Sequence, residues 1–169
     1  MTRFVALLRA VNVGGTGKLP MTKLRAMCEA CGFDHVRTYI ASGNVVFEAD
    51  NPEAIVKVTL EAALKKYAGK PVGTMIRTSV EMAAVLASNP FITASPNRCV
   101  AIFLDTPPPV DLLAGITGRD TEEIAVGLRE IYVHYPDGLA QTKLKISAAR
   151  NGTARNMNTV AKLAEMALK

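Results

Sequence analysis

The sequence of 169 residues contains no tryptophan, and aromatic residues make up only 5% of it. Hydrophobic residues of all kinds nevertheless reach 49%. A chain of this length can bury the core of one full-sized domain or of two small ones. That core must be built mainly from Ala, Val, Leu, Ile and Met side chains.

Long apolar runs are also missing. The apolar runs have the length of strands and end at charges or glycines, whereas a membrane-spanning helix needs about 20 apolar residues. The N-terminal run at 3–13 is too short for a signal peptide and is better explained as a core strand. The three cysteines are an odd number. We therefore expect a cytoplasmic protein with reduced thiols and no membrane partner.

The net charge of +5 is unevenly distributed along the chain. Residues 1–78 carry 11 Lys/Arg and 6 Asp/Glu, residues 79–139 carry 3 and 8, and residues 140–169 carry 6 and 1. If the two basic segments meet in space, they form a basic face that favours anionic partners such as phosphates or nucleic acid. The alternative is a mildly basic surface with no specific partner.

The first 78 residues alternate between strand and helix patterns. The predicted elements are a strand at 3–13, a helix at 21–32, a hairpin at 35–49, a helix at 51–69 and a strand at 70–78. Asn51 is the predicted N-cap of the second helix, followed by Pro52 as its first residue. The order βαββαβ is that of a ferredoxin-like unit.

The second half repeats that order in a weaker form. After a helix at 79–91 with Ser79 as its cap, the predicted elements are a strand at 97–105, a short helix within 106–116, a hairpin at 122–136, a helix within 137–152, a very short strand from 153 and a C-terminal helix. We therefore predict an α+β fold of two tandem ferredoxin-like units, each followed by a helix. The first unit spans 1–78, a connecting helix and loop span 79–96, and the second unit spans 97–169. One domain with a continuous sheet is the alternative.

The stretch VNVGGTGKLP at 11–20 suggests a phosphate-binding loop. A Walker loop is excluded, because Asn12 stands where its first glycine belongs and Leu19 where its hydroxyl residue belongs. A weaker anion site is still possible, in which Gly14, Gly15 and Lys18 act with the following helix N-terminus. Alternatively, the glycines simply turn the chain.

Cysteine and histidine give no support for metal or redox chemistry. The CEAC motif at 28–31 lies on an apolar stripe at the C-terminal end of a helix, where the helix dipole raises the pKa of a thiol. This placement favours core cysteines over zinc ligands or a redox pair. His35 and His134 fall on predicted strands, with no nucleophile motif beside them. We predict no metal and no cofactor.

The segments HYPDGLAQTKLK and TARNMNT, near the C-terminus, are dense in polar residues. Arg155 precedes a predicted helix start, where an arginine and free backbone N–H groups can bind an anion. Capping is the alternative, because Asn156 or Asn158 can serve as the N-cap of the last helix.

Four segments, RAVNVGGTGKLPM, LRAMCEACGFDHVRTYIASGNVVF, VHYPDGLAQTKL and TARNMNTVAKL, occur in this order and together resemble the bacterial family named domain of unknown function 1697. The resemblance implies paired alpha-beta plait domains and no established activity. The sequence departs from the family where members often carry Gly at Ala10, Ser at Thr142 and Trp at Met157. The last change removes a large aromatic and weakens any prediction of base stacking.

Three functional hypotheses follow. The first is a module that binds an anionic small molecule or nucleic acid, with phosphate contacts, since the strands 3–13 and 45–49 offer only Phe4 and Phe47 for stacking. The second is an enzyme of unnamed reaction with a small polar pocket between the two units. The third is a homodimeric interaction protein. The candidate ligand-binding residues are Arg9, Asn12, Gly14, Gly15, Lys18, Ser42, Asn44, Tyr135, Lys143, Arg155, Asn156 and Asn158.

Overall fold

A computed structural model describes residues 1–12 and 18–169 of the chain. The fold over these residues is mixed α+β, with four α-helices and antiparallel sheets. It divides into two compact units. The first unit comprises Met1–Met82 together with Leu163–Lys169, and the second comprises Ala83–Lys162. The predicted division places the whole C-terminal helix in the second unit, whereas its last turns belong to the first.

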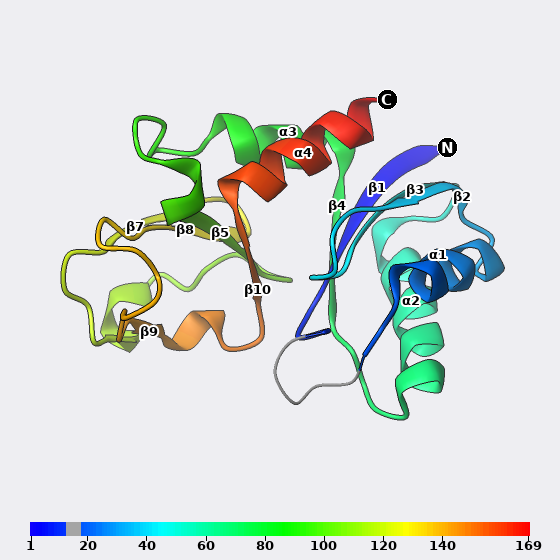
Figure 1. The fold of residues 1–169 in the computed structure, drawn as a ribbon, viewed down its shortest axis with the longest axis horizontal. Helices are drawn as coiled ribbons and strands as arrows, with labels where there is room; N and C mark the ends of the chain where they lie inside the picture. Colours follow the sequence, from blue (N-terminus) through cyan, green and yellow to red (C-terminus); the bar gives the residue numbers. More distant parts are fainter. Residues whose placement is uncertain (13–17) are drawn as a thin grey trace. The chain divides into compact units, whose positions relative to one another are not determined.

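The first unit is built from six elements in the order βαββαβ (Figure 1). They are β1 (Thr2–Leu8), α1 (Met21–Ala30), β2 (Asp34–Thr38), β3 (Asn44–Ala49), α2 (Glu53–Ala68) and β4 (Thr74–Thr78). The strands form an antiparallel sheet in the order β2-β3-β1-β4. The interior position of β1 explains its continuous apolar sequence, because both of its faces are covered.

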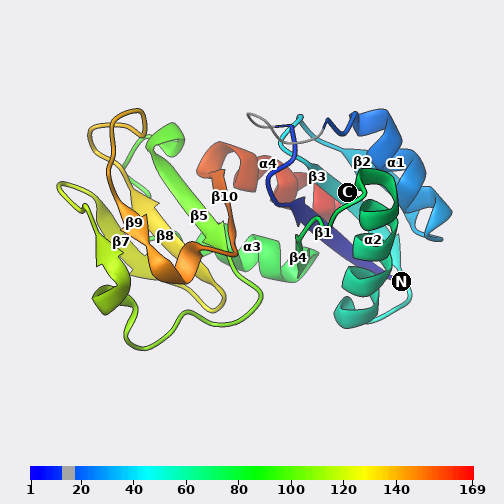
Figure 2. The same cartoon turned by 90° about the horizontal axis from the view of Figure 1, so that it is seen from below.

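Helices α1 and α2 lie on the same side of this sheet (Figure 2). The core between them contains Phe4, Ala6 and Leu8 from alternate positions of β1. Phe33 stacks on Phe47 with ring centroids 4.3 Å apart. Alternation along a strand directs the neighbouring residues of β1, Arg3 among them, to the opposite face of the sheet.

Two predicted helix caps differ from the structure by one residue. Helix α2 has Pro52 at its N-cap, with no side-chain cap, so the prediction of Asn51 was wrong. Helix α3 (Ser79–Ala87) is preceded by Thr78, whose hydroxyl accepts the Glu81 amide at 3.1 Å while the Glu81 carboxylate accepts the Thr78 amide at 2.9 Å. This reciprocal capping box displaces the predicted cap from Ser79 to Thr78.

The second unit holds a second antiparallel sheet with the strand order β10-β5-β8-β7. Its strands are β5 (Cys99–Phe103), β7 (Glu123–Val126), β8 (Glu130–His134) and β10 (Thr153–Asn156), and β6 (Ile116–Thr117) pairs with β9 (Lys145–Ile146) in a small separate sheet. The predicted hairpin at 122–136 is confirmed. Strand β10 is longer than predicted and leads directly into α4 (Met157–Leu168).

The two α-helices predicted inside the second unit are wrong. The segment 106–116 contains only a 3-10 turn, η2 (Leu112–Gly115), and 137–152 contains β9 and a second turn, η3 (Ser147–Ala149). Three consecutive prolines at 107–109 remove backbone donors and restrict the residues before them. Gly138 has a positive φ of 83°. A third turn, η1 (Pro96–Arg98), precedes β5.

Candidate functional site

The predicted site residues fall into two groups, one in each unit. Arg9, Asn12, Lys18, Ser42 and Asn44 belong to the first unit, and Tyr135, Lys143, Arg155, Asn156 and Asn158 to the second. Gly14 and Gly15 lie outside the described residues. Each group is therefore described within its own unit.

Asn12 joins three parts of the first unit just after β1. Its side-chain amide donates to the carbonyl oxygens of Leu19 and Ala41, at 2.8 Å each, and its Oδ1 accepts the Leu19 amide at 2.6 Å. Asn12 therefore acts as a clamp that ties the end of β1 to Leu19, just before α1, and to Ala41, in the turn before β3. The sequence predicts Asn12 as a candidate ligand-binding residue, whereas the structure gives its side-chain amide local structural partners.

The turn between β2 and β3 is fastened to the same place. The buried Asn44 side chain donates to the carbonyl of Tyr39 and the hydroxyl of Ser42, both at 2.9 Å. Gly43 has φ +92°, and a Cβ there would lie 2.6 Å from Val11 Cγ2. Only glycine lets this turn approach the end of β1 so closely. Asn12 and Asn44 therefore have local structural partners.

Three non-glycine residues with positive φ gather around this clamp. Ala10, Asn12 and Ile40 have φ values of 55°, 55° and 51°. A left-handed conformation costs a non-glycine residue roughly 1–3 kcal/mol and persists only where the surroundings impose it. Ala10 is also a position where the resembling family often carries glycine, which fits this geometry. We call this region, Ala10–Asn12 with 39–44, the β1 corner.

A pocket of about 260 Å³ opens beside the β1 corner. Its lining consists of Ala10, Val11, Lys18, Leu19, Leu64, Tyr67, Ala68, Lys70 and Val72. Within the described part of the chain, neither Lys18 nor Lys70 has an ion-pair partner. Lys18 was predicted, but Lys70 and Tyr67 were missed. Tyr67 and Lys70 lie at the lysine-rich end of the second predicted helix, and these lysines entered the prediction only through the net charge of residues 1–78.

Arg9 and Ser42 lie near this pocket without lining it. The Arg9 amide donates to the carbonyl of Gly73 at 2.9 Å, so β1 and the segment before β4 stay paired beyond the strand. The Arg9 side chain is exposed. A Cβ added at Gly73 would lie 3.8 Å from both the Cβ and the Cδ of Arg9, so the aliphatic part of the Arg9 side chain covers that glycine.

In the second unit, Arg155 is a buried side chain of β10. Its Nη1 donates to the Thr153 hydroxyl at 2.7 Å and to the carbonyl of Ala154 at 3.0 Å. Burial lowers the pKa of the guanidinium to about 10. Because only 7% of the residue is exposed, an anion in solution has little access to it.

Asn156 caps helix α4, the role that the sequence left open. Its Oδ1 accepts the amide of Thr159 at 2.9 Å, the geometry of an N-cap side chain bonded to the third helical residue. Asn158 lies one residue into the helix and is exposed. The helix N-terminus is thus satisfied by its own asparagine.

Tyr135 and Lys143 flank a polar loop region of the second unit. Tyr135 packs against the core of Val100, Ile131 and neighbouring apolar residues, and burial raises the pKa of its hydroxyl. Lys143 lines a hollow of about 620 Å³ with Asp120, Glu122 and Asp137. Glu122 accepts the Asp120 amide at 2.7 Å and the Thr142 hydroxyl at 2.8 Å, which lowers its pKa.

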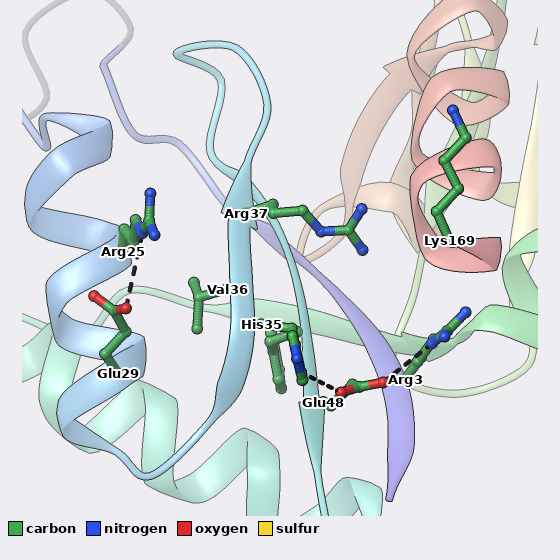
Figure 3. A pocket seen from close by; sticks show the side chains of 9 residues that line it. Arg3, Arg25, Glu29, His35, Val36, Arg37, Glu48 and Lys169 are labelled. Carbon is green, nitrogen blue, oxygen red and sulfur yellow. Dashed lines mark hydrogen bonds and ion pairs between the residues drawn. The ribbon is translucent and has the colours of Figure 1, made fainter.

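A second basic hollow in the first unit contains none of the predicted residues (Figure 3). This groove has a volume of about 610 Å³ and is lined by Arg3, Arg25, Glu29, His35, Val36, Arg37, Phe47, Glu48 and Lys169. We call it the arginine groove. Lys169 comes from the basic segment 140–169 and the arginines from 1–78, so the two basic segments meet here. The charge pattern of the sequence predicts a basic face if these segments meet, but it does not identify the residues that form it.

The cysteines do not form a reactive site. Burial raises the pKa of the Cys28 thiol to about 12 and also raises the pKa of Cys31. Across residues 1–12 and 18–169, no group of three or more His, Cys, Asp or Glu side chains could hold a metal ion. In the same residues, no helix has both the length and the apolar character needed to cross a membrane.

Comparisons with known proteins give a fold and a family. The structure of the conserved bacterial protein SP0830 from Streptococcus pneumoniae is similar, with a TM-score of 0.78, 23% identity and 98% of each chain covered. At this identity the similarity shows the fold alone. A comparison with curated proteins finds no match. The sequence model of the family described as protein of unknown function (DUF1697) matches residues 1–132. The chain therefore belongs to the DUF1697 family.

Proposed function

We propose that the pocket beside the β1 corner binds a small phosphate-bearing molecule. The observation that carries this proposal is the pair Lys18 and Lys70, two cations without ion-pair partners in the described residues, at one pocket of about 260 Å³. Two uncompensated charges at a concave site repel each other and attract an anion.

The remaining lining residues suit the part of such a molecule that does not carry the phosphate. Val11, Leu19, Leu64 and Val72 supply apolar surface, and Tyr67 is 47% exposed at the pocket. Small-molecule sites commonly combine an apolar lining with a few convergent polar groups. The volume suits a sugar phosphate or a mononucleotide better than a dinucleotide.

The end of α2 also contributes to this site. Tyr67 and Ala68 lie in its last turn, where the helix dipole is negative and disfavours an anion. Lys65 and Lys66 lie in the same turn but do not line the pocket. Lys70, just after the left-handed cap residue Gly69, adds a further positive charge.

The strain at the β1 corner supports a functional role. Ala10 and Val11 line the pocket, and Ala10 is held in a left-handed conformation beside the Asn12 clamp. Strained residues cluster at binding sites because the surroundings must hold a defined shape before the ligand arrives. Asn12 supplies that restraint through three hydrogen bonds.

A thermal-shift titration tests the proposal with AMP, ribose 5-phosphate and inorganic phosphate, and with adenosine and ribose as uncharged matches. A ligand at 100 times its Kd stabilises the folded state by about 2.7 kcal/mol. At about 2–4 °C per kcal/mol for a chain of this size, the melting midpoint would rise by about 5–10 °C. We expect this rise for at least one of the two phosphate esters and not for its uncharged match.

The test variant is the double substitution Lys18→Gln with Lys70→Gln. Its charge-matched control is Lys65→Gln with Lys66→Gln. Both pairs remove two charges from exposed positions of the same unit. The first pair should abolish the shift and the second should retain most of it. An equal loss in both pairs, or no shift with any phosphate probe, would overturn the proposal.

We also infer that the first unit is a ferredoxin-like unit. Its element order βαββαβ and strand order β2-β3-β1-β4 support this interpretation. The second unit shares the form of the strand order but has 3-10 turns in place of the two intervening helices. A description as two complete ferredoxin-like units therefore has support only for the first.

A further inference from the structure

We propose that the arginine groove binds the phosphate backbone of a single-stranded nucleic acid without reading its sequence. This site is separate from the pocket beside the β1 corner, and its test does not depend on the function proposed there. The inference rests on the arrangement of cations around β2, the edge strand of the first sheet (Figure 3).

Two of the arginines are held in place by the end of α4. Arg37 Nη2 donates to the carbonyl of Met166 at 2.8 Å, and Arg3 Nη1 donates to that of Ala167 at 3.4 Å. These carbonyls lie in the last turn of the helix, where carbonyl groups have no i+4 amide partner; that of Met166 also accepts the Lys169 amide at 3.3 Å. Arg37 uses one of its five guanidinium N–H donors in this way and Arg3 uses two, because its Nε also donates to Glu48, so the remaining donors of each are available to a ligand.

The carboxylates of the groove only partly neutralise these cations. Glu48 lies 3.2 Å from Arg3 Nε and 2.5 Å from His35 Nδ1, and the Arg3 hydrogen bond lowers the pKa of Glu48. Arg25 lies 3.8 Å from Glu29, and both side chains are more than half exposed. Arg37 has no carboxylate within ion-pair distance among the described residues. Lys169 is paired with Glu165 at 3.0 Å, so the excess positive charge of the groove is centred on Arg37.

The cations are spread along the groove rather than focused on one point. Figure 3 shows Arg25 on α1 at one side of β2, and Arg37 pointing from β2 toward the end of α4 on the other side. A single small anion would need converging donors, as in a bidentate clamp. Separated cations in an open groove instead match a ligand with repeated charges, such as a phosphodiester chain.

An acidic peptide is the less suitable partner. Peptides that bind an edge strand usually add a further strand through main-chain hydrogen bonds. Strand β2 is irregular between Asp34 and Arg37, and His35 has φ 52°. Such bulges protect sheet edges against strand addition. Phosphate contacts come from side chains and do not need a regular edge.

The groove also lacks a platform for base recognition. Phe47 lines it but is only 1% exposed, and the other aromatic ring of the described lining, that of His35, is paired with Glu48. Without stacking or base-edge contacts, affinity comes from phosphate neutralisation and falls steeply with salt. We therefore expect similar affinities for RNA and DNA strands of mixed sequence.

The test is fluorescence anisotropy with a labelled 20-nucleotide single-stranded RNA of mixed sequence, titrated between about 50 and 200 mM salt. The variant Arg25→Gln with Lys169→Gln removes two exposed cations and spares the two arginines that hold α4. We expect roughly tenfold weaker binding at the lowest salt, and a log–log salt slope reduced by about 1.4, since each lost phosphate contact contributes about 0.7.

Two controls make the result specific to the groove. Lys65→Gln with Lys66→Gln removes the same charge from α2 outside the groove and should retain most of the affinity and the slope. Glu29→Gln removes a groove carboxylate and should strengthen binding a few-fold. Equal weakening by the two charge-matched pairs, or no RNA binding at 50 mM salt, would overturn the proposal. Binding of a decaglutamate peptide in preference to RNA would also overturn it.

Discussion

The two units arrange four strands in the same way but differ in what connects them. In each sheet the first strand of the unit is central, with the third and last strands beside it: β1 between β3 and β4, and β5 between β8 and β10. The first unit connects its strands with α1 and α2, whereas the second uses short 3-10 turns and a two-stranded sheet. The same strand order therefore forms with and without α-helices as the connections between its strands.

A buried arginine in the last strand of each sheet makes the two units more alike. Arg77 of β4 pairs with Val5 of β1, and Arg155 of β10 pairs with Ala101 of β5. Both arginines are buried, and each donates through Nη1 to the carbonyl of the preceding residue, at 2.9 and 3.0 Å. A repeated buried arginine at equivalent strands favours an architectural role for Arg155 over a role in one ligand site.

The largest effect should come from the turn that supports the β1 corner. Gly43→Ala places a Cβ 2.6 Å from Val11 Cγ2 and 2.9 Å from Leu8 Cβ at a φ of +92°. Backbone strain and overpacking together should cost about 4 kcal/mol. Urea denaturation measures this cost.

Gly32→Ala is the matched control for that substitution. Gly32 has a similar φ of +86°, but a Cβ there meets nothing within 4 Å. Its cost should be about 1 kcal/mol, from backbone strain alone. Equal costs for the two variants would show that the close approach to β1 does not stabilise the corner.

The cores of the two units should differ in their sensitivity to truncation. Leu60 of α2 is fully buried in the first core, whereas Leu112 of the turn η2 is 6% exposed in the second. Leu60→Ala should cost about 3 kcal/mol and Leu112→Ala about 2 kcal/mol, because a short turn can collapse into the space more easily than a helix can. Chemical denaturation of both variants provides the comparison. A larger cost at Leu112 would contradict the view that helices make the first core the more rigid.

The contrast between the units also explains where prediction from sequence succeeded. The first unit is locally consistent: the apolar run of β1, the spaced apolar residues of α1 and α2, and the ASGN turn each predict the element that forms. In the second unit, the local signal that favours the helix predicted within 137–152 is Asp137, a residue type that often caps helices. Without an apolar stripe at helical spacing, that single signal could not outweigh Gly138 and the pairing of β9 with β6.

The candidate sites were less predictable because they depend on contacts between distant segments. Lys18 was identified beside its glycines, but its partner Lys70 lies after α2 and is brought near only by the folded unit. The arginine groove combines β1, α1, β2 and the end of α4. No local pattern marks residues that are separated by more than 130 positions, such as Arg3 and Lys169. Charge counting suggested a basic face without locating it.

The helix caps of the two units should give a smaller change in stability, which tests whether Asn156 acts as a cap. Asn156→Ala removes the side chain that accepts the Thr159 amide at the start of α4, and should cost about 1 kcal/mol. Thr78→Ala removes the equivalent acceptor before α3, at a similar cost. Asn156→Asp should restore most of the stability, because aspartate caps equally well. If Asn156→Asp is as destabilising as Asn156→Ala in urea denaturation, Asn156 has a role other than capping.

The smallest expected effect is a change in carboxyl pKa, which shows how each unit keeps one carboxylate ionised. The pKa of Glu48 in the first unit is lowered mainly by the Arg3 hydrogen bond, whereas that of Glu122 in the second is lowered mainly by the Asp120 amide and the Thr142 hydroxyl. Since both folded-state pKa values lie below the unfolded ones, each carboxylate stabilises the fold above its unfolded pKa. That contribution is lost as the pH falls through the folded pKa.

Salt separates the two causes, because it screens a charged partner at the surface but leaves neutral donors almost unaffected. Carboxyl NMR titrations at about 0.05 and 1 M salt should show the pKa of Glu48 rising toward its ordinary value while that of Glu122 stays nearly constant. Thr142→Val should raise the pKa of Glu122 at either salt concentration, since it removes one neutral donor. Equal salt responses of the two carboxylates would mean that Arg3 acts on Glu48 as a hydrogen-bond donor alone, and the electrostatic difference between the units would disappear.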